Sequence, residues 1–183
     1  MKLTMKLFRH LLVAAALCTT FLISESASAQ RATPRARVEQ ALLTMDSPAP
    51  ASFWQHLGGE GLRILESILN DAQAPRALRR RAVYAARHYG EAARPLLTSR
   101  LEDANEDLIL RRYAALAMAE GLGVAAIDAL VPLLEHHDAS IREGVVIALA
   151  RLSDSHARAL LEARRRVEHD QVVRLALDQA LAQ

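Results

Sequence analysis

The sequence predicts an all-α fold, an α-solenoid of stacked antiparallel helical hairpins. From residue 53 onward the chain is rich in Ala, Leu and Arg and shows no strand-length alternation of polar and apolar residues, which favours helices. An arginine preceded by an aliphatic residue recurs at intervals of 32, 31 and 32 residues, at Arg79, Arg111, Arg142 and Arg174. A fixed period of this length is typical of stacked repeat units. We therefore expect residues 51–183 to form a repeat domain of about four units after a truncated one.

Residues 1–29 have the three parts of a secretory signal peptide. Basic residues within the first nine positions precede the apolar run 11–23, and Ala27-Ser28-Ala29 forms a cleavage site. The apolar run is shorter than the about 20 residues that a membrane-spanning helix needs. We expect cleavage before Gln30, no membrane insertion afterwards, and an exported protein that is periplasmic or secreted.

Cleavage would change both the charge and the cysteine content. The chain has 23 Lys+Arg and 21 Asp+Glu, and residues 1–29 hold three of these bases and one of these acids, which leaves 20 of each. The only cysteine, Cys18, is removed as well. The mature protein would have no net charge that attracts nucleic acid and no thiol for a disulfide, a nucleophile or a metal ligand.

Residues 30–50 are expected to be a flexible leader that contains a short helix. The polar run 30–37 includes Pro34, and residues 38–45 place apolar side chains on one side of a helix. Pro48 and Pro50 then end that helix, because proline is not tolerated in a helix interior.

Each repeat unit is expected to begin with a helix that buries the same face. Counted from the aliphatic residue before each arginine, small or apolar residues recur four, seven and eight positions later. These offsets form one stripe of a helix. The twelve stripe residues are Ala82, Ala85, Ala86, Ala114, Ala117, Met118, Val145, Ala148, Leu149, Leu177, Ala180 and Leu181.

The starts of these first helices are marked four residues before each arginine. Asp107, Asp138 and Asp170 stand there in three units and Pro75 stands there in the other. An aspartate at the N-cap accepts hydrogen bonds from free amide groups of the first turn, and proline suits the first helical position. Both residue types therefore predict a helix start at the same place.

A second helix is expected after each first helix, for example over residues 92–102 and 155–168. In the truncated unit, residues 53–57 would be the remnant of a first helix and residues 61–70 its second helix. Phe53 and Trp54 are expected to cover the N-terminal end of the stack, since large aromatic side chains bury much area; the alternative is that Trp54 recognises a ligand.

The pattern of an aspartate, an aliphatic residue and an arginine, followed by small residues in units of about thirty, resembles HEAT repeats. The short, PBS-lyase-like variety is the most similar. The resemblance covers residues 53–183, with one longer inner loop around Gly121 and Gly123. It implies a right-handed superhelical stack whose second helices line the inner curve, and it is more specific for fold than for function.

Several residue combinations could be mistaken for catalytic or metal sites. The Asp-to-Arg spacing recurs in every unit, which suits a ladder of caps and ion pairs between repeats. The pairs His137-Asp138 and His169-Asp170 lie at equivalent places, but repeats stack about 8–10 Å apart, too far to share one ion. No histidine is followed directly by glutamate, so the His-Glu motifs of di-iron hydroxylases built from HEAT repeats are missing. We expect no metal and no cofactor.

Residues 153–156 contain serine, aspartate and histidine, but a catalytic triad is assembled from separated elements. This segment is interpreted as a turn between helices with Ser153 or Asp154 as a cap. The glycines of residues 58–61 and 121–123 follow no predicted strand, so they are expected to reverse the chain rather than to bind phosphate. No catalytic residue is predicted.

The candidate partner-binding residues are three arginines on the second helices. Arg94 and Arg158 occupy equivalent positions 64 residues apart, and Arg165 lies in the basic run 164–166. If the second helices line the inner curve, these side chains would face a partner there, as arginine often does in binding hot spots. The alternative is a solvated face that nearby glutamates neutralise.

The predicted function is that of a non-catalytic, exported scaffold, a monomer that presents a curved helical surface to a protein or peptide. The alternative is an accessory or lyase-type enzyme subunit, which only the repeat subtype implies and which export argues against. Nucleic-acid binding is not expected from a neutral mature chain.

Overall fold

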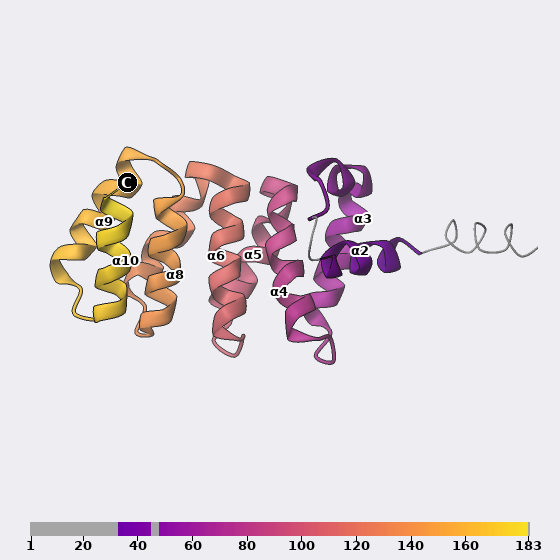
Figure 1. Ribbon diagram of the computed structural model, residues 1–183, viewed down its shortest axis with the longest axis horizontal. Coiled ribbons are helices and arrows are strands. Elements are labelled where there is room, and N and C mark those ends of the chain that lie inside the picture. The colour runs from indigo at the N-terminus through magenta and orange to yellow at the C-terminus, as the bar shows by residue number, and fades with distance from the viewer. Residues whose placement is uncertain (1–32, 45–47, 183) are drawn as a thin grey trace, which may run out of the picture. The chain divides into compact units, whose positions relative to one another are not determined.

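The computed structural model describes residues 33–44 and 48–182 (Figure 1). The predicted signal peptide and its cleavage site lie outside the described residues. The chain divides into two compact units, Met1–Arg37 and Val38–Gln183, and helix α2 (Pro34–Leu43) contains residues of both. The predicted short helix is therefore present, but it begins at Pro34, a residue type suited to a first helical position.

Helix α3 (Ala51–Asn70) contains both helices of the truncated unit. It is kinked at Gly58, which has φ 50° and ψ −142°. On the two sides of the kink lie the predicted segments 53–57 and 61–70. The apolar side chains Trp54, Leu65 and Ile68 are buried, so both parts of α3 contribute to the core.

Three helical hairpins and a final helix follow, and no described residue lies in a strand. The first helices are α4 (Arg76–Ala85), α6 (Leu108–Leu122), α8 (Ala139–Ala150) and α10 (Gln171–Leu181). The first hairpin continues through the 3₁₀ helix η1 (Ala86–Ala93) into α5 (Arg94–Glu102). The second continues through η2 (Gly123–Ala126), α7 (Ile127–Leu130) and η3 (Val131–Glu135). The third is completed by α9 (Ser155–Val167). The protein is an α-solenoid, as the sequence predicts.

The predicted stripe of each first helix faces the core. Ten of the twelve stripe residues are buried, among them Ala82, Met118 and Leu149. The exceptions are Ala180 and Leu181 on α10, which are only partly buried. Their partial exposure follows from their position on the last described helix, which packs mainly on α8 and α9.

Three first helices start with the predicted aspartate caps. The Oδ1 atom of Asp107 accepts a hydrogen bond from the N–H of Ile109 at 2.9 Å, and Asp138 and Asp170 accept equivalent bonds from the residues two positions later. Pro75 differs from the expectation because it is the N-cap of α4 and not its first residue. Its carbonyl oxygen accepts from the N–H of Arg79 at 3.0 Å, so proline here contributes only its acceptor.

Glycines with a shared backbone conformation reverse the chain between the helices of three units. Gly58, Gly90 and Gly123 have φ of 50°, 52° and 59°, with ψ between −131° and −142°. This region is accessible essentially only to a residue without Cβ. The turn of the third hairpin contains Ser153, which has φ 51°. The predicted role of the glycines near 58 and 123 as chain reversals is confirmed, and Gly90 is the member that the sequence analysis missed.

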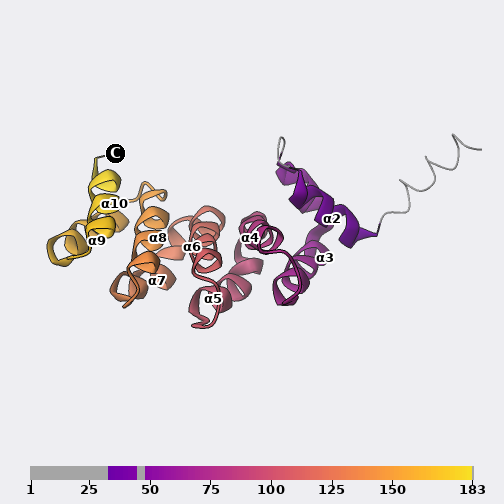
Figure 2. The ribbon, with the colours of Figure 1, turned by 60° about the horizontal axis from the view of Figure 1, so that its bottom comes forward.

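The helices form two rows, and the first helices form the tighter one (Figure 2). Helix α4 packs on α6, α6 on α8 and α8 on α10, whereas the described residues of the second helices contact first helices far more than one another. Gly144 permits this approach, since a Cβ there would lie 2.7 Å from Cγ of Arg112. The more closely packed row lies on the inner side of the bend within residues 38–182. The expectation that second helices line the inner curve is therefore wrong.

The stretch Leu108–Glu135 is long and apolar enough to cross a membrane by length and composition alone. In the structure it is not one straight helix, because Gly123 reverses the chain after α6. Its apolar side chains Leu110, Met118 and Leu130 are buried within the repeat stack. Packing of a hairpin in the core accounts for the apolar character of this stretch.

Candidate functional site

The predicted binding residues Arg94 and Arg158 both hold neighbouring helices together. Arg94, at the start of α5, donates to the carboxylate of Glu91 and to the carbonyl oxygen of Ala125, the latter at 3.1 and 3.2 Å. Arg158 on α9 donates to the carbonyl oxygen of Leu181 at 2.7 Å. The two arginines thus bind backbone acceptors of the following unit, which is a structural use of their equivalent positions.

Arg165, the third predicted binding residue, lies on α9 and forms an ion pair with Asp178 of α10. Contacts within the chain therefore engage all three arginines. A role for Arg94, Arg158 and Arg165 in partner binding stays a prediction.

The repeat arginines form a ladder, but their carboxylate partners differ from the expected aspartates. Arg79 donates to both carboxylate oxygens of Glu106 at 2.9 and 3.1 Å. Arg142 donates in the same way to Glu168 at 2.8 and 3.0 Å. Both glutamates lie in the loop before the next first helix and are at most 8% exposed. The ladder thus connects each of these first helices to the loop that leads to the next unit.

Each of these glutamates also binds an arginine of the second helix. Arg100 lies 3.2 Å from Glu106, and Arg164 lies 2.8 Å from Glu168. Burial raises the pKa of Glu168, but hydrogen bonds from Arg142, from the N–H of Asp170 and from Arg164 outweigh burial and lower this pKa to about 2. The middle unit has His136 in the corresponding loop, where Nε2 lies 3.3 Å from a guanidinium nitrogen of Arg111.

The predicted turn is confirmed at Ser153 and Asp154, with Asp154 as the cap, whereas Ser155 and His156 already belong to α9. Its Oδ1 accepts hydrogen bonds from the N–H groups of His156 and Ala157 at 2.9 and 3.0 Å. Within residues 33–44 and 48–182, no group of three or more histidine, aspartate or glutamate side chains is placed to hold a metal. The carboxylates that the sequence analysis considered for chemistry are occupied with helix starts and ion pairs.

The first helices carry most of the large apolar side chains that remain exposed. Ile109 is 51% exposed, Ile147 36% and Leu175 58%. Val172 and Leu108 extend this set. Because these residues lie on α6, α8 and α10, they belong to the row on the inner side of the bend. We call the exposed side of this row the first-helix surface.

A groove of about 360 Å³ lies between α4, α6 and α8 on this surface. Its apolar walls include Ile109, Leu116 and Ile147. The guanidinium carbon of Arg80 lies 5.6 Å from the centre of the Tyr113 ring, which is within range of a cation–π interaction. We call this hollow the α6 groove; it combines aliphatic walls with the half-buried arginines Arg80 and Arg112, and Arg112 pairs with Glu143 at 3.2 Å.

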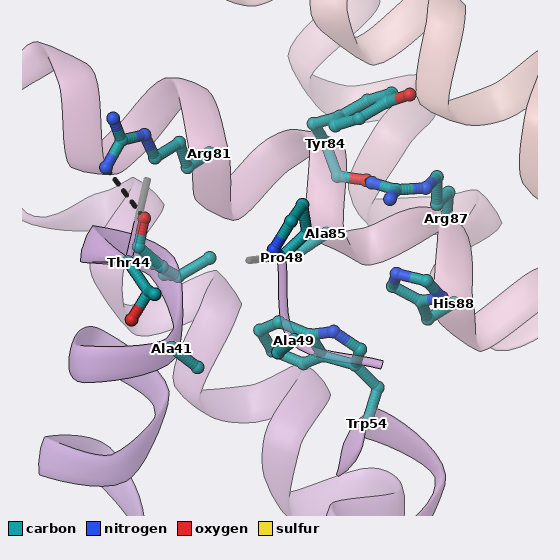
Figure 3. A pocket seen from close by; sticks show the side chains of 11 residues that line it. Ala41, Thr44, Pro48, Ala49, Trp54, Arg81, Tyr84, Ala85, Arg87 and His88 are labelled. Carbon is teal, nitrogen blue, oxygen red and sulfur yellow. Dashed lines mark hydrogen bonds between the residues drawn. The ribbon is translucent and has the colours of Figure 1, made fainter. Parts of the chain in front are cut away.

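A second hollow, of about 250 Å³, lies where α2, α3 and α4 meet (Figure 3). We call it the Trp54 pocket. Its walls are formed by Ala41, Leu42, Thr44, Pro48, Ala49, Trp54, Arg81, Tyr84, Ala85, Arg87 and His88. The Trp54 ring is stacked on His88, with ring centres 5.8 Å apart and an interplanar angle of 7°. Trp54 is only 3% exposed, so it is a packed wall of the pocket.

A ring contact and one shared side chain connect these hollows along the first helices. Tyr84 lines the Trp54 pocket, and its ring contacts Tyr113 of the α6 groove in an edge-to-face arrangement with ring centres 5.8 Å apart. Ile147 lines both the α6 groove and a further hollow between α8 and α10. The first-helix surface is therefore a chain of adjoining hollows from α3 to α10.

Residues 95–182 match the family model of HEAT repeats. The matched segment spans nearly half of the chain, from the second residue of α5 to the end of α10. It confirms the resemblance to HEAT repeats for this part. A comparison with curated proteins finds no match. The HEAT repeats supply most of the first-helix surface, whereas the Trp54 pocket lies N-terminal to the matched segment.

Proposed function

We propose that the protein is an exported, non-catalytic scaffold that binds an extended segment of a protein partner along its first-helix surface. The main support is the chain of hollows that the ring contact between Tyr84 and Tyr113 and the common wall residue Ile147 connect. An extended peptide needs several small binding pockets in a line, and a curved row of helices offers them. The matching HEAT repeats are a helical scaffold, which agrees with this reading.

The exposed aliphatic side chains explain why this surface would bind a protein. Leu175, Ile109 and Ile147 lose contact with water when a partner covers them, and burial of apolar area is the main driving force of association. The arginines beside them add hydrogen-bond donors that orient a partner. By contrast, the predicted residues on the second helices are engaged in bonds within the chain.

The surface can be tested in cells by photo-crosslinking. A photoreactive phenylalanine analogue replaces Ile147 in one variant and Arg166 in another; Arg166 is exposed on α9, in the opposite row. We expect a discrete protein adduct from position 147 and none from position 166. Adducts that form only at position 166 would contradict the proposed surface.

Export is a separate part of the proposal and has its own test. Mass spectrometry of the protein from the exported fraction should find Gln30 at the N-terminus. An intact Met1 in the membrane fraction would refute cleavage while leaving the binding surface untouched. Cleavage would also remove Cys18, so the exported protein should not react with thiol reagents.

A further inference from the structure

The Trp54 pocket combines positive charge with apolar walls in a way that specifies a ligand. Arg81, Arg87 and His88 line it, and none of the described lining residues is acidic. Burial and the neighbouring Arg87 guanidinium lower the pKa of His88 below its ordinary value. Arg81 and Arg87 supply the guanidinium cations of the pocket.

Both guanidinium groups keep donors for a ligand. Arg81 donates one hydrogen bond, to the carbonyl oxygen of Leu42 at 2.8 Å, and has no acidic partner among the described residues. Arg87 donates to the carbonyl oxygen of Tyr84 at 2.9 Å and lies 3.5 Å from Glu120. A guanidinium has five N–H donors, so each arginine keeps donors for a carboxylate, and within residues 33–44 and 48–182 no acidic side chain pairs with Arg81.

The remaining walls suit an apolar group next to that carboxylate. Leu42, Ala49, Trp54 and Ala85 place hydrocarbon and an indole ring around the hollow, as Figure 3 shows for the labelled side chains. A ligand that fills the Trp54 pocket must therefore carry a negative charge and an apolar group close to each other. A C-terminal residue meets this requirement because its carboxylate and its side chain are attached to the same carbon atom.

The place of the pocket also favours a chain end. It adjoins the α6 groove through Tyr84 and Tyr113, and on its other side stand Ala41 and Leu42 of α2. A segment that follows the first-helix surface toward the N-terminal units would end at this wall. If the carboxylate belonged to an acidic residue within the partner segment, the partner chain would have to continue past this wall.

We propose that the Trp54 pocket binds the C-terminal carboxylate of the partner, with an aliphatic last residue, through Arg81. This inference rests on the proposed function, since it assigns an end and a direction to the segment that the first-helix surface binds. The occupant is a polypeptide C-terminus. Free small carboxylates are the competing source of the same chemistry.

Fluorescence can test the proposal on the mature protein, because Trp54 is its only tryptophan. The probes are a hexapeptide, acetyl-Ser-Leu-Ser-Leu-Ser-Leu, with a free carboxylate, the same peptide with a C-terminal amide, and N-acetyl-leucine. We expect the free acid to change the Trp54 emission and to bind at least about tenfold more tightly than the amide, because charged hydrogen bonds are strong ones. N-acetyl-leucine should bind more weakly than the hexapeptide, since it cannot reach the α6 groove.

Variants separate the carboxylate contact from general effects. Arg81→Gln should reduce the preference for acid over amide to less than about twofold, while Arg166→Gln on α9 should leave it unchanged. If Arg81→Gln lowers the melting temperature, Ala41→Phe supplies a second test, because it narrows the pocket without removing a charge and should weaken binding of both peptides.

Equal affinity for acid and amide in the native protein would overturn the proposal, and equal affinity for N-acetyl-leucine and the hexapeptide would assign the pocket to small carboxylates instead. Crosslinking at position 147 does not depend on the pocket. A lost acid preference with intact crosslinking would therefore refute the pocket alone.

Discussion

Arg142 on α8 holds Glu168, a carboxylate 26 residues later, with two hydrogen bonds of 2.8 and 3.0 Å. The same glutamate accepts hydrogen bonds from Arg164 of α9 and from the N–H groups of His169 and Asp170. One buried side chain thereby joins the two helices of a hairpin to the loop that starts the next unit. Glu106 has the same arrangement with Arg79 and Arg100.

Replacing this carboxylate should weaken the whole stack. Glu168→Gln would leave the partly buried guanidinium group of Arg142 without its counter-charge and would leave Arg164 with Glu135 alone, so we expect a loss of about 1–3 kcal/mol in the free energy of unfolding. Urea denaturation measures it. The matched control is Glu162→Gln, whose side chain is 48% exposed and pairs with Arg158; its effect should stay below about 0.5 kcal/mol. Equal losses of unfolding free energy in the two variants would show that Glu168 does not join its hairpin to the next unit.

Low pH should remove the stabilisation that the Glu168 carboxylate gives to the folded protein. The pKa of Glu168 is about 2 in the folded protein, below the ordinary value of 4.5, so the folded state binds fewer protons than the unfolded state in this range. The stabilisation is fully present above about pH 4.5 and is lost as the pH falls toward about 2. Unfolding free energies measured between about pH 6 and pH 2.5 should show native protein losing its advantage over Glu168→Gln. If the difference in unfolding free energy between native protein and Glu168→Gln stays constant over this pH range, the pKa of Glu168 is not lowered.

Alanine substitutions can test whether the turn at Gly123 requires glycine. Gly123 has φ 59° and open space around it, and Gly59 also has open space but lies in a helix with ordinary φ. Gly123→Ala should therefore cost about 1–3 kcal/mol from backbone strain, whereas Gly59→Ala should be neutral or stabilise by up to about 1 kcal/mol. Thermal and urea unfolding of both variants measure the contrast. Two variants of equal stability would mean that the turn does not need glycine.

Core packing on α8 can be tested with leucine truncations. Leu149 is 1% exposed and belongs to the predicted stripe, and Leu175 is 58% exposed on α10. Leu149→Ala should lower the free energy of unfolding by about 2–5 kcal/mol, because it leaves a cavity in the stack. Leu175→Ala should change it by less than about 0.5 kcal/mol. If Leu149→Ala causes no measurable loss of stability, the predicted repeat register, in which Leu149 faces the core, is wrong.

The repeat register was predictable because each unit repeats its local signals. Asp107, Asp138 and Asp170 cap helices, and the small residues that follow the arginines pack one helix on the next. Gly58, Gly90 and Gly123 also recur at intervals of 32 and 33 residues. That second period could have been found in the sequence, and it would have located the turns of three units, although not the turn at Ser153.

The binding surface was harder to predict, because it depends on which row of helices packs more tightly. Periodicity shows that first helices are equivalent, but it does not show that Gly144 lets α6 and α8 approach. The Trp54 pocket was beyond reach for a similar reason. Trp54, Arg81 and Arg87 come from the separate elements α3, α4 and η1 and line one hollow only in the folded chain.

The central claim is that a partner binds the first-helix surface, and the affinity of surface variants for the crosslinked partner tests it most directly. The variants are Ile147→Asp on α8, on this surface, and Val167→Asp on α9, where the valine is 55% exposed. By isothermal titration calorimetry, we expect Ile147→Asp to weaken binding at least about tenfold, because it places a charge in the apolar contact, and Val167→Asp to leave the affinity unchanged. Unchanged affinity for Ile147→Asp together with weakened binding by Val167→Asp would contradict the claim and assign the interface to the second helices.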